Sequence, residues 1–272
     1  MNRKKQALSL GAALLILVVV GIYVFYQNND EDGEPSLTVS QAIKIFEQQD
    51  IHLTKTTDPD GEMINEVRPV TYFIGGTKSK LHIYQYDSIG ERVTASDIQK
   101  EKVGELYFYN AVNTAKNLLL IVELEPIEEE NMTAEYWEPI GKVSRTVFEE
   151  LNDAKEIIYT GTGTNWSSNT TVKYYEYFYK DQEATLRHES WNQTTSTLQY
   201  LGDDIASVGD ISYEYQLGSH GGSGSGLSIQ PDGTVGLGSS GGSGSIPRKD
   251  DTITFTITWN DQTETFTGHA LN

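Results

Sequence analysis

One uncharged stretch near the start of the chain, Ala7 to Tyr26 (ALSLGAALLILVVVGIYVFY), constrains the protein more than any other feature. As a helix with ~1.5 Å of rise per residue, it extends about 30 Å, the thickness of the hydrocarbon core of a bilayer. Basic residues flanking a membrane helix stay in the cytoplasm, and Arg3, Lys4 and Lys5 precede this run. We therefore expect a cytoplasmic flank over 1–6, a single-pass signal-anchor over 7–26, a linker over 27–36, and the rest of the chain outside the cell membrane.

A cleaved signal peptide is the alternative to this anchor. Its apolar region is usually shorter and is followed by a cleavage site of small residues. The nearest such site here is Val19-Val20-Gly21, and the residues after it, 22–26, are still apolar. The pattern favours the uncleaved anchor. The chain contains no Cys, which excludes a lipid-modified cysteine and disulfide bonds.

The part of the chain beyond the anchor is strongly acidic. It holds 17 Lys and Arg residues against 39 Asp and Glu residues, a formal charge of about −22. Such a charge disfavours nucleic acid and anionic lipid head groups as partners. With about 240 residues, this part is long enough for two domains.

The first domain is expected over 37–153, as a small antiparallel α+β domain. The capping box Thr38-x-x-Gln41 predicts the start of a helix, and Ser88-x-x-Glu91 predicts a second one. A third helix is expected with Pro139 in its first turn. Between the helices, alternating or continuous apolar runs predict strands over 52–57, 69–74, 80–86, 105–112 and 117–124.

The second domain, over 154–272, is predicted to be all β. Aromatic and β-branched runs alternate there with turn residues, and no helical stripe appears. Strands are expected over 156–160, 171–180, 184–191, 196–201, 210–217, 227–230, 234–237, 252–259 and 263–268. This number of short strands is typical of a β-sandwich, with an immunoglobulin-like arrangement as the expectation.

Two glycine and serine tracts repeat within this domain, at 218–225 (GSHGGSGS) and 238–245 (GSSGGSGS). They flank a short hairpin, so we expect them to lie side by side as loops with few side chains. The structural interpretation is favoured over a binding site. His220, in the first tract, is the single histidine that we single out for testing as a binding residue.

Catalytic and metal-binding patterns are weak. The second tract matches G-x-S-x-G and G-x-G-x-x-G, but both motifs need a following helix, and GSGSIPR follows instead. The five histidines lack the spacing of a zinc site, so neither a metal nor a cofactor is expected. No catalytic residue is assigned.

The densest aromatic segment is the predicted strand 171–180 (TVKYYEYFYK), whose aromatic residues occupy both faces. One face must belong to the core, and the other is available for stacking on a sugar or a partner. Tyr175, Tyr177 and Tyr179 share one face of this strand, and we take them as candidate binding residues.

Several segments resemble those of uncharacterised membrane-anchored proteins and lipoproteins of low-GC Gram-positive bacteria. KLHIYQYDS leads into a helix containing GER, AKNLLLIVEL follows later, and TGTGTNW and TITFTITWNDQTETFT lie in the second domain. The resemblance implies a membrane-anchored protein with a sandwich domain and brings no activity or functional residue with it. The lipid-modified cysteine of the lipoproteins is missing here.

The leading hypothesis for function is a non-enzymatic module outside the membrane that binds a protein or a cell-wall component. The alternative is a cell-envelope hydrolase acting on glycan or peptide. Clustered acids in a concave pocket would favour the enzyme, and a flat aromatic patch on the sandwich would favour binding.

Overall fold

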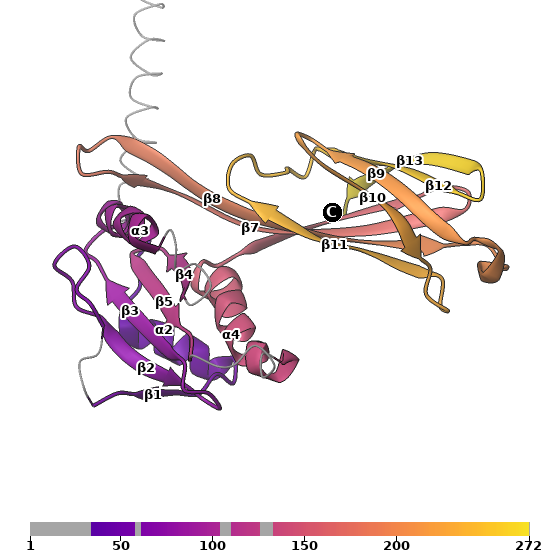
Figure 1. Cartoon of the computed structure of the whole chain (residues 1–272). Coiled ribbons are helices and arrows are strands. Elements are labelled where there is room, and N and C mark those ends of the chain that lie inside the picture. Colours follow the sequence, from indigo (N-terminus) through magenta and orange to yellow (C-terminus); the bar gives the residue numbers. More distant parts are fainter. Residues whose placement is uncertain (1–33, 58–60, 104–109, 126–132, 272) are drawn as a thin grey trace, which may run out of the picture. The chain divides into compact units, whose positions relative to one another are not determined.

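The computed structural model describes residues 34–57, 61–103, 110–125 and 133–271 (Figure 1). The predicted flank 1–6, the anchor 7–26 and most of the linker 27–36 lie outside these residues. In the described part of the chain, no helix has both the length and the apolar character needed to span a membrane. Leu37–Asn272 forms one compact unit, which contains both predicted domains, each built around its own antiparallel sheet.

The first sheet has five antiparallel strands in the order β1-β2-β3-β5-β4. The elements follow the predicted order: α2 (Val39–Gln48), β1 (Leu53–Lys55), β2 (Val70–Ile74), β3 (Lys80–Gln85), α3 (Ile89–Val103), β4 (Asn110–Ala115), β5 (Leu118–Glu123), α4 (Ala134–Thr146) and the π-helical turn η2 (Val147–Leu151). The first residues of the predicted strand 105–112 lie outside the described residues. Strand β5 is interior, as its continuous apolar sequence indicates.

Helices cover both faces of this sheet. On one face, α2, α4 and η2 form a core in which Phe46, Leu120 and Val143 are fully buried. On the other face, α3 packs through Ala95 against Leu119. Strand β4 is the edge of this sheet, with α3 on one side of it and α4 and η2 on the other.

Capping explains where two of the helices begin. Thr38 accepts a hydrogen bond from the backbone of Gln41, whose side chain reaches back to Thr38, so the predicted capping box is confirmed. The predicted start of the third helix is wrong. Thr133 caps α4 one turn and a half earlier, and Pro139 is therefore inside the helix.

The second sheet has eight antiparallel strands in the order β10-β9-β12-β13-β6-β7-β8-β11. Its strands are β6 (Lys155–Thr162), β7 (Trp166–Lys180), β8 (Leu186–Tyr200), β9 (Asp210–Leu217), β10 (His220–Ser228), β11 (Thr234–Gly242), β12 (Thr252–Trp259) and β13 (Gln262–Ala270), with the short 3-10 helix η3 (Ile205–Ser207) before β9. Alternate residues such as Trp166, Phe255 and Ile257 point to one face and form a single buried core.

The sandwich prediction holds only in its coarser form, an all-antiparallel β structure. The eight strands belong to one sheet, and its edge strands β10 and β11 approach each other, so the sheet nearly closes (Figure 1). A β-sandwich consists of two separate sheets that pack face to face. Here β7 and β8 pair continuously over 15 residues, and the two strands predicted over 184–191 and 196–201 are one strand.

The glycine tracts are strands rather than the expected loops. Glycines of β10 pair with tyrosines of β9, Gly222 with Tyr215 and Gly224 with Tyr213. A Cβ at either glycine would lie 2.6 Å from the ring of its tyrosine, so the rings lie over the glycines and occupy the space that side chains would fill. The expected proximity of the two tracts is confirmed, because His220 Nε2 of the first tract bonds to the carbonyl oxygen of Ser245 in the second at 2.7 Å.

Candidate functional site

The hairpin formed by β7 and β8 carries an aromatic face that packs against helix α3. Directly paired residues of an antiparallel ladder point to the same side, and Tyr175 pairs with Trp191 and Tyr177 with Glu189. Tyr175 and Tyr177 are buried together with Ile89 of α3. The candidate tyrosines therefore form a contact with the five-stranded part, and none of them belongs to an open, flat platform.

An arginine from α3 is the centre of this contact. Arg92 is 2% exposed. Its Nη2 donates to Glu189 Oε2 at 2.7 Å and to the Tyr177 hydroxyl at 3.2 Å, and its Nε donates to the carbonyl oxygen of Lys116 at 2.8 Å. Glu189 also accepts from Tyr177 at 3.1 Å and from Thr114 at 3.5 Å. A buried ion pair requires such extra hydrogen bonds to offset the loss of hydration.

The burial of these groups changes their proton affinities. Burial and the nearby Glu189 raise the pKa of Tyr175 to about 12, although Arg92 acts in the opposite direction. Burial also raises the pKa of Tyr177 far above its usual value. For Arg92, burial opposes the charged form, but Glu189 and the tyrosines outweigh it and the pKa is raised. Both tyrosines are therefore neutral and Arg92 is charged at neutral pH.

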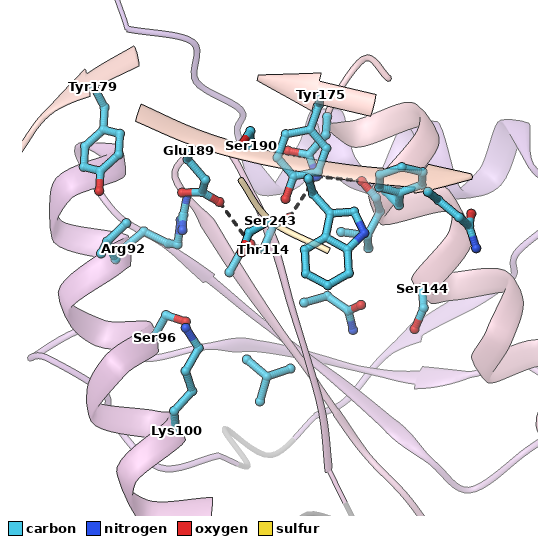
Figure 2. Close-up of a pocket in the computed structure, with 18 of the residues that line it drawn as sticks. Arg92, Ser96, Lys100, Thr114, Ser144, Tyr175, Tyr179, Glu189, Ser190 and Ser243 are labelled. Carbon is cyan, nitrogen blue, oxygen red and sulfur yellow. Dashed lines mark hydrogen bonds and ion pairs between the residues drawn. The ribbon is translucent and has the colours of Figure 1, made fainter. Parts of the chain in front are cut away.

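Next to this contact lies a cavity of about 760 Å³, which we call the β4-edge cavity. It is bounded by α3, by the edge strand β4, by α4 and η2, by strands β7 and β8, and by the segment directly after β11. Figure 2 shows the side chains that line it, with Arg92, Ser96 and Lys100 succeeding one another along α3. Its volume is within the range of about 300–1,000 Å³ that is typical of small-molecule sites.

Most of the polar groups in the wall are neutral. Hydroxyls and amides come from α3, β4, α4, β8 and the segments after η2 and β11: Ser96, Asn113, Thr114, Ser144, Asn152, Ser190, Gln193 and Ser243. The rings of Tyr175 and Phe148 contact each other at 5.9 Å, and Trp191 also lines the cavity with 42% of its surface exposed. The wall therefore combines hydrogen-bonding groups with aromatic surface.

Two amide atoms of the wall are buried without a hydrogen-bond partner among the described residues, Asn113 Nδ2 and Asn152 Oδ1. The orientation of Asn152 is fixed, because its Nδ2 donates to the carbonyl oxygens of Thr114 at 2.9 Å and Val147 at 3.0 Å. Buried polar atoms are nearly always paired in folded proteins. These two atoms thus mark a place where the protein alone leaves hydrogen bonds unmade.

The charged residues of the wall are mostly paired. Arg92 pairs with Glu189, and Lys100 pairs with Asp97 at 3.4 Å. Arg145 forms no ion pair with any residue that the structure describes. In a chain with a formal charge of −19, the wall of this cavity therefore has an excess of one positive charge.

The sequence-derived candidates divide between two places. Tyr175 and Tyr179 line the β4-edge cavity, and Tyr177 supports it through Arg92. His220 is elsewhere, at the start of β10, where its Nε2 bonds to the carbonyl oxygen of Ser245 at 2.7 Å.

Sequence reasoning missed Arg92, Glu189, Asn113 and Asn152. A signal existed for Arg92, since it lies between Ile89 and Val93 on the apolar stripe of its helix, where a charge is unexpected. Among the described residues, no group of three or more His, Asp or Glu side chains is arranged to hold a metal ion.

Compared with protein-family models, curated proteins and solved structures, the chain gives no significant match to any of them.

Proposed function

We propose that this chain is a non-enzymatic binding module, held on the outer side of a cell membrane by Ala7–Tyr26, and that the β4-edge cavity is its ligand site. The observation that carries the proposal is a cavity of about 760 Å³ lined by aromatic rings, whose wall includes two asparagines that each have a buried, unpartnered amide atom. The uncharged run followed by an acidic chain supports the location.

The state of the carboxylates favours binding over the envelope hydrolase. A catalytic acid or base needs a carboxyl group that is free to exchange a proton with the substrate. Of the two carboxylates in the cavity wall, Glu189 accepts from Arg92, Tyr177 and Thr114, and Asp97 is paired with Lys100. Glu189 is therefore fully engaged by the protein, and the charge of Asp97 is partly balanced by an exposed lysine.

The lining also restricts the kind of ligand. Neutral hydroxyls and amides outnumber charges, so a polar ligand with many hydrogen-bonding groups is favoured over a lipid or an apolar peptide. The unpaired Arg145 tolerates a neutral or acidic ligand better than a cationic one. A carbohydrate of the cell envelope has these properties.

Site-specific photocrosslinking in intact cells tests the proposal. The full-length chain is made with a photoreactive phenylalanine in place of Trp191, inside the cavity. The matched control has the same group in place of Phe178, which is 60% exposed and points to the opposite face of the same hairpin. We expect capture of an envelope component from position 191 and none from position 178.

Three other results would contradict the proposal. Capture from position 178 alone would place the site on the outer face of the hairpin. Release of glycan or peptide fragments from cell walls by the purified protein would favour the hydrolase. Protection of the chain from protease added to cells stripped of their wall would exclude the external location.

A further inference from the structure

We infer that the β4-edge cavity selects an N-acylated amino sugar, with the amide of the acyl group bound between Asn113 and Asn152. The inference rests on the proposed function, because it assumes that the cavity is a ligand site. It adds the chemical group that the site distinguishes.

The two unpartnered atoms are complementary to a secondary amide. Asn152 Oδ1 can only accept, since its Nδ2 is held by two carbonyl oxygens, and Asn113 Nδ2 can only donate. A secondary amide offers an N–H to the first and a C=O to the second. Its donor and acceptor are separate atoms on opposite sides of a planar group, so one amide serves two protein groups at different positions.

Both asparagines belong to one short part of the wall. Asn152, directly after η2, reaches the backbone of β4 at Thr114, the residue that follows Asn113. The amide of the ligand would therefore lie at the edge of β4, where a sheet still has backbone groups available. Asn152 is 5% exposed and its Oδ1 is covered by the protein, so an unpaired oxygen there is unfavourable, and the amide of the ligand reaches it by displacing the side chains that cover it.

The rest of the wall suits a sugar ring. Trp191 offers an exposed aromatic surface for the apolar face of a ring. The hydroxyls of Ser96, Ser144 and Ser243 belong to the same wall and can exchange hydrogen bonds with sugar hydroxyls (Figure 2). A nucleobase also has a flat ring and an amide edge, but it has fewer hydrogen-bonding groups to pair with the serine hydroxyls of the wall.

Three β-1,4-linked trisaccharides that differ at one position distinguish the groups: the trimers of N-acetylglucosamine, glucosamine and glucose. Each is titrated into the full-length chain in a detergent without a sugar head group, and binding is measured by calorimetry and tryptophan fluorescence. We expect the acetylated trimer to bind at least tenfold more tightly than the glucose trimer, since two buried groups stay unpaired with the latter.

Asn113→Leu is the decisive variant, because it removes the donor and keeps the branched shape and the number of heavy atoms. It should reduce the preference for the acetylated trimer over the glucose trimer to less than threefold. Its melting temperature should not fall, because the Asn113 side chain has no hydrogen bond at its buried nitrogen to lose. Asn113→Ala is a smaller second variant. Trp191→Ala should weaken the binding of both trimers.

The outcomes separate this inference from the proposed function. Equal affinity for the acetylated and glucose trimers, lost in Trp191→Ala, would overturn the amide selection and leave a carbohydrate site. Tighter binding of uridine than of any trimer would also overturn it. If no sugar binds but position 191 still captures an envelope component in cells, the inference fails and the proposed function stands. If neither occurs, both fail.

Discussion

Replacing Glu189 with Leu tests the contact that holds the β7–β8 hairpin against α3. The substitution leaves the guanidinium of Arg92, 2% exposed, without a carboxylate, and it removes the acceptor of Tyr177 and Thr114. Removing one partner of a buried ion pair costs about 3–5 kcal/mol. The Glu189 side chain is 20% exposed, and Arg92 keeps the carbonyl oxygen of Lys116, so we expect the lower end, about 3 kcal/mol.

The loss is measured as a change in melting temperature of the full-length chain, followed by circular dichroism. For a folded unit of this size, ~1 kcal/mol corresponds to roughly 2–4 °C, so Glu189→Leu should melt about 6–12 °C lower. Arg187→Gln is the matched control, two residues away on the same strand. Its ion pair with Asp181 is exposed, and such pairs contribute about 0–1 kcal/mol, so the shift should stay below roughly 4 °C.

The double variant Arg92→Met with Glu189→Leu separates an unpaired charge from lost packing. With no charge left to bury, most of the stability should return, because apolar replacements of buried ion pairs are often neutral. The reasoning would be refuted by a double variant that melts as low as Glu189→Leu. It would also be refuted by a single variant that melts no lower than the Arg187→Gln control.

Three further predictions follow from individual contacts. Gly90→Ala in α3 should destabilise the protein, because its Cβ would meet a backbone carbonyl oxygen of the hairpin at 2.6 Å. Gly141→Ala in α4 has open space around its Cβ and should raise the stability by about 0.5–1 kcal/mol. Thermal melting measures both changes. The pKa of Tyr175 is raised to about 12 in the folded state. The stability that neutral Tyr175 contributes is therefore present below pH ~10 and is lost as the pH rises from about 10 to about 12. Tyr175→Phe should weaken the dependence of the melting temperature on alkaline pH. Hydrogen bonds from Arg248, and to a smaller extent His188, lower the pKa of Glu176. The stability that ionised Glu176 contributes is therefore present above the ordinary pKa of 4.5 and is lost as the pH falls through the lower folded value, so Arg248→Gln should weaken that acid dependence.

Local features of the fold could be predicted from sequence because their causes are local. The capping box at Thr38 involves residues three apart, and the turn at Asn260 and Asp261 joins strands that pair directly. Their hydrogen bonds form between neighbours in the chain, so the local pattern contains all the information. The order of helices and strands in the five-stranded part was predictable for the same reason.

The glycine strands could not be predicted, since their extended conformation depends on pairing with other strands, β9 and β8, and not on the residues of the tracts themselves. A tract such as GGSGS has no side chains to favour an extended conformation, and glycine weakens a strand. The compensation comes from Tyr213 and Tyr215, whose rings lie over the glycines only after the register of β9 and β10 is set. The 15-residue pairing of β7 with β8, within a single sheet that is nearly closed, likewise depends on contacts that no local pattern contains.

The candidate site was only partly predictable. Tyr175 and Tyr179 are distinct in the sequence as part of an aromatic strand, and both line the cavity. Arg92 and Glu189 are 97 residues apart, and no single-sequence signal pairs them. The missing hydrogen bonds of Asn113 and Asn152 are a property of the packed structure, so sequence composition cannot reveal them.

The Arg92–Glu189 pair has a second consequence, which concerns the cavity more than stability. Arg92, Ser96 and Lys100 are spaced by four residues and lie on one face of α3, so fixing the first determines that the other two face the cavity (Figure 2). An apolar pair would pack as well but would not fix the rotation of the helix, because hydrophobic contact has no direction. The double variant Arg92→Met with Glu189→Leu should therefore regain stability and still bind the acetylated trimer at least tenfold more weakly than the original chain. Titration of that variant decides the point: unchanged affinity with restored stability would mean that packing alone positions α3.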